Sequence, residues 1–431
     1  MSKEKKFAEN LINFIDNSKS QFHAVAETKD FLNKKGFEEL SLEKTWKLEK
    51  GKKYYTTKNN SALIAFTIGD NLLEDGFRIV GGHTDAPGFR IKPNPEMKAA
   101  GKYLRLNTEV YGGAILNTWF DRPLSIAGRV SLRTDNPLKP EEKLVDLEKP
   151  LMIIPNLAIH MNREVNDGFK FNPQEHTLPL VQMINDKFES ENFLVKLIAE
   201  KLNINYKDIL DFELYVYSTE KGQIIGAEEE FISIGKLDDL AMVHAEMNAI
   251  AQAESKSFNV AIAFDNEEVG SSTKQGAGSP FVKNVLKRIS LSQGLTEEEF
   301  LVAIEKSFLI SADQAHAKHP NFQDKCDPTN VPVMNGGPTI KIASNQAYTT
   351  DSTSSAIYKS ICEKAEVPYQ MFVNRSDMRG GSTIGPISSS QLPLRSVDIG
   401  CPILGMHSVR ELGGVYDHYY VYRSFVEFYS L

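Results

Sequence analysis

Five short apolar runs in this 431-residue chain each end in a histidine or an acid. With the polar residues that follow them, the runs read FRIVGGHTD, FISIGKLDD, VAIAFDNEE, SFLISAD and PILGMH. In open α/β sheets, functional groups gather beyond the carboxyl ends of the strands, so ends that are distant in sequence can meet. These five ends would bring together two imidazoles and three carboxylates, from His83, Asp238, Glu268, Asp313 and His407.

This set of side chains indicates a metal site. Any one of them alone is more often a helix cap or a loop residue than a ligand. Together they exceed what one four-coordinate zinc with an open position can bind. They suit two ions that share a bridging carboxylate, so the pattern predicts a two-metal hydrolytic site.

Acids beside the expected ligands suggest supporting roles. Asp85 can accept a hydrogen bond from the far ring nitrogen of His83 and fix its tautomer, although a turn aspartate before Pro87 is the ordinary interpretation. In an extended chain, Glu267 and Glu268 point to opposite sides. We therefore expect Glu268 to bind metal and Glu267 to act as general base on a metal-bound water, the alternative being an exposed acidic turn.

The order of the segments predicts an interrupted catalytic domain. Strands and helices alternate in the C-terminal part, which favours an α/β layer fold. Residues 93–231 instead carry many short β-like runs separated by Pro, Gly and charged residues. Because the stretch from His83 to Asp238 is too long for a loop, we expect a catalytic domain formed by residues 1–92 and 232–431, with a β-rich domain inserted.

Composition excludes several classes of protein. With 41% hydrophobic and 25% charged residues, the chain has ordinary globular usage. It contains no apolar run of about 20 residues and no secretory signal, so we expect a cytoplasmic protein without a membrane partner. A net charge of −8 without a basic cluster argues against nucleic acid as a partner. The three cysteines match no metal or redox spacing and are expected to be packed thiols.

The chain resembles the aspartyl aminopeptidases, a family of two-zinc metallopeptidases, along nearly its whole length. The motifs that carry the resemblance are QFHAV, GGHTDAPGF, LAIHMNR, GKLDDL, DNEEVGS, SADQAHAKHPN, STIGP and MHSVRE. The resemblance implies a three-layer α/β/α catalytic domain with a mixed central sheet, and an inserted, barrel-like dimerisation domain. It also implies release of N-terminal amino acids, preferentially Asp or Glu, from peptides.

The family pattern assigns the metal ligands. It implies that one Zn²⁺ is held by His83, Asp238 and Asp313, and that the other is held by Asp238, Glu268 and His407. Asp238 would bridge the two ions, and Co²⁺ or Mn²⁺ are alternative occupants.

The resemblance also bears on the residues around the ligands. Glu267 takes the position of the general base, and Asp85 takes that of the residue that orients the histidine. Similar enzymes usually carry asparagine where this chain has Asp239, which adds an acid beside the metals. In related zinc peptidases the peptide bond after the bridging aspartate is often cis, which leads us to expect a cis bond between Asp238 and Asp239.

Acidic substrates require a cation in the pocket. The resemblance places Lys341, in PTIKIAS, and His316, in DQAHA, against the substrate. Considered alone, the first would be a surface lysine and the second a loop histidine. Gly381, in RGGSTIGP, is expected in a pocket wall, where glycine lets the backbone approach a ligand, and Arg379 is a weaker candidate for contacting the acid. A tight turn is the ordinary interpretation of this stretch.

The inserted domain has an expected role in assembly. Similar enzymes form tetrahedral dodecamers built from dimers, in which the insertion reaches the active site of a neighbouring subunit. By this resemblance His160, in LAIHMNR, would complete the pocket in trans. For His23, in QFHAV, a packing role at a helix start is the default interpretation.

Two other functions are compatible with part of this pattern. N-acyl amino acid deacylases use a similar two-zinc ligand set, and a non-catalytic shell or cargo protein could keep the fold without the reaction. A serine hydrolase is disfavoured because the chain has no G-x-S-x-G elbow.

Overall fold

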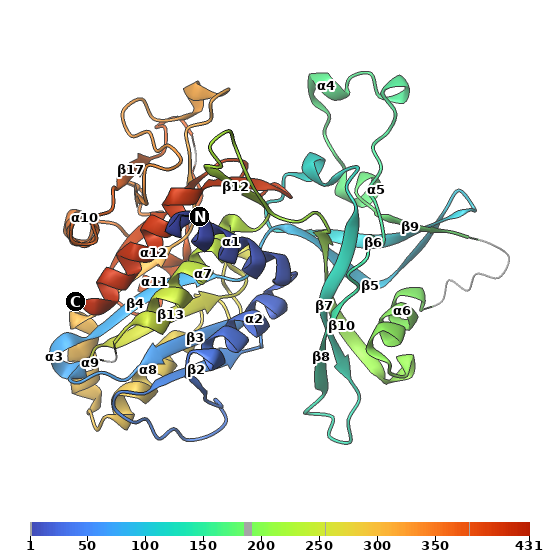
Figure 1. Cartoon of the computed structure of the whole chain (residues 1–431). Coiled ribbons are helices and arrows are strands. Elements are labelled where there is room, and N and C mark those ends of the chain that lie inside the picture. The colour runs from blue at the N-terminus through green and yellow to red at the C-terminus, as the bar shows by residue number, and fades with distance from the viewer. Residues whose placement is uncertain (1, 185–191, 255, 379) are drawn as a thin grey trace. The chain divides into compact units, whose positions relative to one another are not determined.

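The computed structural model describes residues 2–184, 192–254, 256–378 and 380–431 (Figure 1). They divide into two compact units. The first unit contains residues 1–85, 222–406 and 411–431, and the second contains residues 86–221 and 407–410. Among the described residues, none of the helices combines the length and the apolar character that a membrane span requires.

A nine-stranded mixed sheet forms the centre of the first unit. The pairs β13–β4, β4–β14 and β14–β18 are parallel, whereas β3 pairs antiparallel with β13 and β16 pairs antiparallel with β18. In spatial order the strands are β1 (Glu38–Glu39), β2 (Lys53–Lys58), β3 (Ala62–Thr67), β13 (Phe258–Phe264), β4 (Phe77–His83), β14 (Phe308–Ala312), β18 (Arg395–Gly400), β16 (Thr339–Ile342) and β17 (Gln370–Val373).

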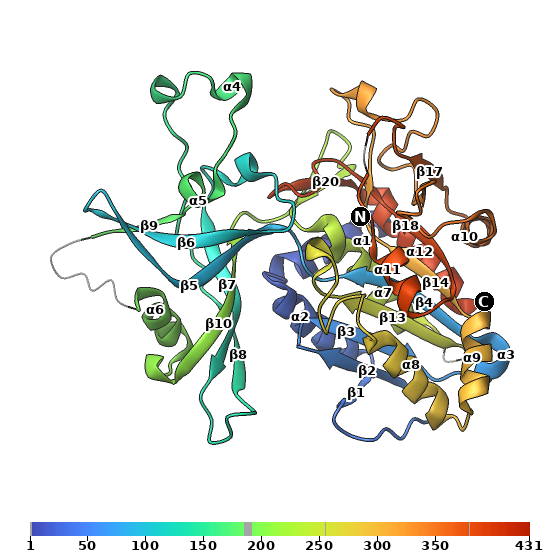
Figure 2. The same ribbon diagram turned by 180° about the vertical axis from the view of Figure 1, so that it is seen from behind.

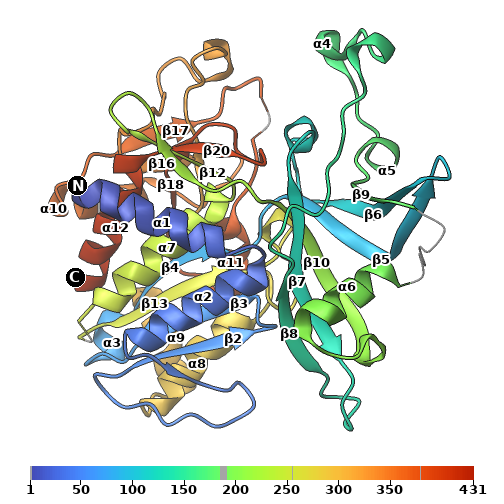
Figure 3. The ribbon, with the colours of Figure 1, turned by 45° about the vertical axis from the view of Figure 1, so that its right-hand side comes forward.

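Helices cover both faces of this sheet, which confirms the predicted three-layer α/β/α class. One face carries α2 (Gln21–Lys34), α7 (Leu237–Gln252), α10 (Ser352–Lys364) and α12 (Val415–Ser430), with α1 (Lys3–Asn17) packed on α7 and α12 (Figure 3). The opposite face carries α8 (Phe281–Ser292), α9 (Glu297–Lys306) and α11 (Ile384–Gln391) (Figure 2).

The central strands are apolar on both sides because they are covered on both faces. Successive side chains of a strand point to opposite faces. In β4, Ile79 packs with α8 and α9, and Val80 packs with α7 and α12. In β13, Ala261 and Ile262 divide in the same way. Such strands read as continuous apolar runs, as parallel strands buried on both faces do.

The second unit has its own core around a six-stranded antiparallel sheet. Its strands, in order, are β8 (Glu141–Asp146), β7 (Leu124–Leu132), β10 (Ile209–Ser218), β5 (Gly88–Ala99), β6 (Tyr103–Tyr111) and β9 (Leu180–Met183), and α6 (Phe193–Leu202) packs on the core. Two isolated bridges, Leu124 with Met152 and Ile153 with Leu180, connect β7 to β9. Residues 152–153 thus join the two strands, which gives the predicted barrel-like character.

The ends of the inserted unit differ from the predicted range of 93–231. At its start, β5 pairs with β6 from its first residue, since Gly88 lies opposite Tyr111. At its end, β11 (Gln223–Ile225) and β12 (Phe231–Ile234) form a three-stranded sheet with β20 (Glu411–Gly414). This small sheet belongs to the first unit, so the insertion spans residues 86–221.

Two buried histidines join α7 to α12. His244 Nδ1 and His418 Nε2 lie 2.9 Å apart, and both rings pack against Phe7 of α1 at 4.8 Å between centroids. Burial lowers the pKa of His244 to about 3. Burial, and next the charge of His244, lower the pKa of His418. Both imidazoles are therefore neutral in the folded protein at neutral pH.

This pair should make stability depend on pH. The unfolded histidines have a pKa near 6.5, so the unfolded chain binds more protons between about pH 3 and pH 6.5. The free energy of unfolding therefore decreases as the pH falls below 6.5. Each histidine lowers it by up to about 1.4 kcal/mol per pH unit. Urea unfolding at pH 5 and pH 7.5 should show this loss in the native protein and a smaller one in the double variant His244→Leu/His418→Leu. Equal losses in the two proteins would contradict the assignment.

Candidate metal centre

Three neighbouring parallel strands bring acids and a histidine to one edge of the main sheet. His83 ends β4, opposite Phe264, the last residue of β13. Asp313 follows β14, which pairs with β4 on the other side. Parallel strands end at the same edge, so the residues that follow β13, including Glu267 and Glu268, lie beside His83.

Asp238 reaches the same edge from the first turn of α7. The backbone of Asp238 and of Asp239 is not helical, and the peptide bond between these residues is cis, as expected from the sequence. A Cβ on Gly82 would lie 2.7 Å from Asp239 Oδ2, so a larger residue where β4 passes this turn would displace the Asp239 carboxylate. The strand before α7 is β12 of the small sheet. The expectation of five strand ends in one sheet is therefore wrong for Asp238, and also for His407, which follows the two-residue β19 (Pro402–Ile403).

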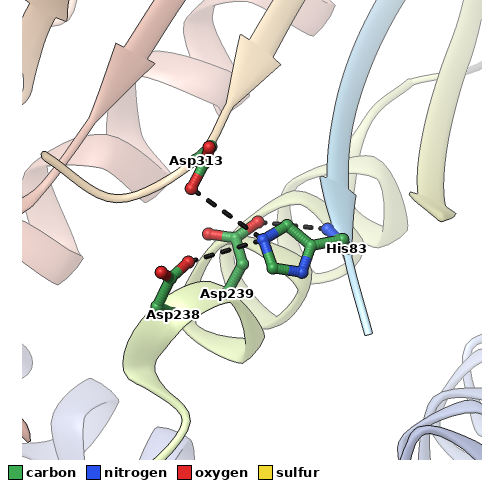
Figure 4. Close-up of side chains that lie close together, drawn as sticks. All are labelled: His83, Asp238, Asp239 and Asp313. Carbon is green, nitrogen blue, oxygen red and sulfur yellow. Dashed lines mark hydrogen bonds and ion pairs between the residues drawn. The ribbon is translucent and has the colours of Figure 1, made fainter. Parts of the chain in front are cut away.

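The centre of the site is a buried cluster of one imidazole and three carboxylates (Figure 4). His83 Nε2 lies 3.4 Å from Asp238 Oδ1 and 3.9 Å from Asp313 Oδ1. Asp239 Oδ2 accepts a hydrogen bond of 3.1 Å from the main-chain N–H of His83. Each of the four residues offers one possible ligand atom, and these four atoms all lie within 4.8 Å of one another. Asp238 and Glu268 also have ligand atoms within 4.8 Å of each other. Asp238 therefore belongs both to the cluster around His83 and to a second group that contains Glu268.

Asp85 holds both the histidine and the glutamate turn. Its Oδ1 lies 3.3 Å from His83 Nδ1, and its main-chain carbonyl is 3.1 Å from the same nitrogen. Its two carboxylate oxygens accept hydrogen bonds from the main-chain N–H groups of Glu267 and Glu268, at 3.1 and 3.2 Å. When His83 is neutral, as a metal ligand must be, a proton on Nδ1 leaves the lone pair of Nε2 on the side of Asp238 and Asp313.

The two glutamates lie in a 3₁₀ turn, η4 (Glu267–Val269), and not in an extended chain. Asn266, with φ of 63°, turns the chain out of β13. Glu267 and Glu268 each place a carboxylate oxygen within 4.8 Å of a ring nitrogen of His83. The expectation that they point to opposite sides is therefore wrong, because a helical turn separates neighbouring side chains by much less than a strand does.

Burial and mutual repulsion keep protons on these acids in the absence of a cation. Burial raises the pKa of Glu267 to about 8; the charge of His83 opposes this, and Asp313 and Asp238 add to it. Burial, then the charge of Asp238, raise the pKa of Glu268. Burial acts to lower the pKa of His83, but the charge of Asp239 and hydrogen bonds to neighbouring carboxylates outweigh it, and the pKa is raised well above its usual value.

The donor set fits zinc. An imidazole nitrogen and carboxylate oxygens are ordinary zinc ligands. Asp239 Oδ1 is buried, and among the described residues it has no hydrogen-bond partner. Burying like charges side by side is costly, and a cation removes much of that cost.

His407 lies in the second unit. Its main-chain carbonyl accepts a hydrogen bond of 3.0 Å from Ile115 N, and its Nδ1 lies 3.1 Å from the carbonyl oxygen of Gly113. If Nδ1 carries the proton and donates to Gly113, Nε2 keeps its lone pair. The ligand role of His407 stays a prediction.

Lys341 is buried, with only 2% of its surface exposed, so it is not the surface lysine of the ordinary interpretation. Its Nζ donates hydrogen bonds of 3.0 Å to the carbonyl oxygens of Asp313 and Gln314, and it lies 3.7 Å from Asp313 Oδ2. The ring of Tyr348 lies 5.3 Å from this ammonium. Burial acts to lower the pKa of Lys341, but the charges of Asp313 and other neighbouring acids raise it overall, so the side chain is a cation beside the cluster.

The other expected substrate residues are placed as follows. His316, in β15 (Ala315–His316), is exposed, with its ring 6.0 Å from that of Phe372. His160 is exposed in the second unit, in the 3₁₀ turn η2 (Ile159–Met161). Gly381 is exposed, and a Cβ on it would have no other atom of the described residues within 4 Å. Arg379 lies outside the described residues.

Two other glycines of the same stretch lie close to side chains of other segments. A Cβ on Gly380 would overlap the side-chain amide of Asn374, and one on Gly385 would lie 2.6 Å from both carboxylate oxygens of Asp398. Packing thus explains glycine at these two positions. The contact of Gly381 with substrate stays a prediction.

Sequence reasoning missed several buried polar residues around the cluster. Gln314 Nε2 donates to the carbonyl of Leu237, and Glu411 accepts from the main-chain N–H of Asp238. Both residues fall inside motifs that the sequence singled out, SADQAHAKHPN and MHSVRE. A polar residue within a few positions of an expected ligand was the available signal, but it does not say which backbone group the side chain reaches.

Comparison with known proteins identifies the family. The family model described as aminopeptidase I zinc metalloprotease (M18) matches residues 14–429. The chain belongs to this family. A probable M18 family aminopeptidase 2 of Clostridium novyi is 59% identical over 433 residues and covers 100% of both chains.

Solved structures agree with this assignment. A chain of a cryo-EM structure of the Ape4 and Nbr1 complex has a TM-score of 0.94 at 36% identity, covering 99% of this chain and 86% of the other. The mApe1 dodecamer of S. cerevisiae has a TM-score of 0.85 at 28% identity, covering 98% and 95%. The protein is thus a zinc-dependent aminopeptidase, a hydrolase of peptide bonds. This family assignment favours the aminopeptidase over the deacylase and the shell protein.

Asp85→Asn tests the organisation of the site. An amide keeps one acceptor oxygen but turns an NH₂ group toward a main-chain N–H of the glutamate turn. We expect metal affinity and kcat each to fall by about 10- to 100-fold, measured by metal competition and by steady-state kinetics.

Asp327→Asn is the matched control, because Asp327 also accepts from two main-chain N–H groups, those of Thr329 and Asn330, away from the cluster. It should change neither quantity. Native metal affinity and kcat in Asp85→Asn would show that the carboxylate does not organise the site.

Proposed function

We propose that this aminopeptidase uses two zinc ions and releases N-terminal Asp or Glu from peptides. The observation that carries the proposal is the position of Asp238. Its carboxylate has oxygen atoms within 4.8 Å of ligand atoms of His83 and Asp313, and within 4.8 Å of a ligand atom of Glu268. A carboxylate common to two groups of ligands can bridge two ions in a two-metal site.

The proposed ligands follow from this arrangement and from the family motifs. His83, Asp238 and Asp313 hold one ion, and Asp238, Glu268 and His407 hold the other. Co²⁺ or Mn²⁺ could replace zinc, because nitrogen and oxygen donors of this kind bind several divalent metals.

The proposed mechanism divides the work between the metals and the protein. When bound, the zinc ions polarise the scissile carbonyl and make a water molecule acidic. The carboxylate of Glu267 would take a proton from the attacking water as its oxygen bonds to the carbonyl carbon, and would deliver that proton to the amine nitrogen as the C–N bond breaks. Cations beside Glu267 favour its ionised form, which is the form that accepts a proton. Asp85 keeps His83 and the glutamate turn in place during both transfers.

Selectivity for acidic residues is assigned to Lys341. Two of its three N–H groups are directed at main-chain carbonyls, which fixes the ammonium in position. The remaining N–H can bind the side-chain carboxylate of the substrate, and Tyr348 packs beside it. His316 and Gly381 are proposed to contact the rest of the N-terminal residue.

Assembly is proposed to complete the pocket. Residues 155–170 of the second unit expose apolar side chains beside His160, with Leu157 53%, Ile159 46% and Met161 69% exposed. Exposed apolar clusters of this kind indicate a protein contact. We therefore propose that His160 enters the pocket of a neighbouring subunit in a homo-dodecamer built from dimers, as the dodecameric relative suggests. A cytoplasmic location without nucleic-acid or membrane partners is part of the same proposal.

Glu267→Gln tests the reaction. The amide cannot accept the proton, so kcat should fall by roughly 100- to 10,000-fold. Metal analysis should still give close to two ions per chain, because Glu267 is not one of the proposed ligands. One ion per chain in the native protein, or near-native kcat in the variant, would refute the proposed mechanism.

Lys341→Met tests the substrate preference. Loss of a charged hydrogen bond costs about 1.5 to 3 kcal/mol, so the ratio of kcat/KM for aspartyl to leucyl anilides should fall by roughly 10- to 100-fold. Lys53→Met is the matched control, since Lys53 Nζ also donates to two carbonyls, those of Ala251 and Ala253, elsewhere in the first unit. An equal loss on both substrates in Lys341→Met would remove Lys341 from substrate recognition.

A further inference from the structure

The peptide unit that leads into Asp238 is held on both of its polar atoms. Its carbonyl oxygen, that of Leu237, accepts a hydrogen bond of 3.0 Å from Gln314 Nε2. Its N–H, that of Asp238, donates a hydrogen bond of 3.1 Å to Glu411 Oε2. All four residues are buried, with at most 3% of their surface exposed.

The two holding side chains come from segments that are themselves fixed to the sheets. Gln314 directly follows Asp313, and the main-chain N–H groups on either side of it donate to Ile399 and Cys401. Glu411 begins β20 and lies opposite Ile234, the last residue of β12. Strand pairing therefore holds the backbone from which each of these two side chains extends.

Ordinary helix capping does not account for this arrangement. A capping acceptor is normally supplied by the residue just before the helix. Here the N-cap residue, Lys236, makes no side-chain cap hydrogen bond, and the acceptor is a glutamate 173 positions away. Burying a glutamate costs free energy, and a local serine or aspartate could have capped the helix without it.

The two hydrogen bonds fix the orientation of the peptide plane to which Cα of Asp238 is attached. A peptide unit is planar, so holding both its C=O and its N–H prevents the whole plane from rotating. The backbone at Asp238 is not helical, with φ of −83° and ψ of 104°, so α7 itself does not impose this orientation. The hydrogen bonds from Gln314 and to Glu411, together called the clamp, supply the constraint on this peptide plane that the first helical turn does not supply.

We propose that Gln314 and Glu411 are positioning residues that hold the carboxylate of Asp238 where two metal ions can share it. The inference rests on the proposed ligand role of Asp238. Because that carboxylate would contact both ions, a looser peptide should weaken the binding of both. Residues that support metal ligands typically change affinity by about 10- to 100-fold when they are replaced.

Metal release tests the proposal without any substrate. Gln314→Met and Glu411→Leu keep the approximate size of the side chain but remove the donor or the acceptor. Each should accelerate the loss of both ions to a chromophoric chelator by about 10-fold or more and change the visible spectrum of the Co²⁺-substituted protein. Glu411→Gln keeps an acceptor oxygen and should restore release rates to within a few-fold of native.

Two further variants separate the possible failures. Tyr358→Phe removes a buried hydrogen bond to Ser424, between α10 and α12, and should leave metal release unchanged. Asp238→Asn tests the ligand role itself. If Asp238→Asn loses metal while Gln314→Met and Glu411→Leu release both ions at native rates, the positioning role of Gln314 and Glu411 is refuted. If Asp238→Asn keeps both ions, the proposed ligand role of Asp238 is refuted instead. Urea unfolding of the metal-free variants controls for general loss of stability.

Discussion

The candidate ligands are fixed mainly by hydrogen bonds from their own main-chain N–H groups to carboxylates of other segments. His83 donates to Asp239, Asp238 donates to Glu411, and Glu268 donates to Asp85. Each bond joins two segments that lie far apart in sequence. A charged acceptor makes such a bond stronger than a neutral one, so the backbone of each ligand is held before any metal arrives. This explains why the site contains carboxylates, such as those of Asp85 and Glu411, that are not proposed as metal ligands.

The same arrangement creates an electrostatic problem that a cation solves. Four buried carboxylic acids, from Asp85, Asp238, Asp239 and Asp313, surround one imidazole. Burial, opposed by the charge of His83 and supported by that of Asp313, raises the pKa of Asp239 well above its usual value. Without a cation, Asp239 can stay buried only by sharing the charge of His83 or by holding a proton. Metal binding and proton release at this edge are therefore coupled.

The sequence predicted what depends on local pattern. The apolar runs that end at His83, Glu268 and Asp313 are strands of one sheet, and their order allowed the layer class and the interrupted domain to be inferred. The sequence alone could not predict features that depend on contacts between distant segments. The insertion begins before residue 93 because β5 pairs with β6 from its first residue, and the glutamates share one side because Asn266 turns the chain into η4. Neither feature has a local pattern that distinguishes it from the alternative.

Hydrogen bonds to a carboxylate also organise the segments around Asp398. Its buried carboxylate accepts from Ser311 Oγ at 2.5 Å, from Thr383 Oγ1 at 2.6 Å, and from both N and Oγ1 of Thr349 at 2.6 and 2.8 Å. These donors come from β14, from the start of α11 and from the loop that carries Tyr348. One carboxyl group thus ties two loops to the central sheet. Since Tyr348 lies beside the ammonium of Lys341, the geometry of the proposed acid-binding pocket depends on a carboxylate that need not touch the substrate.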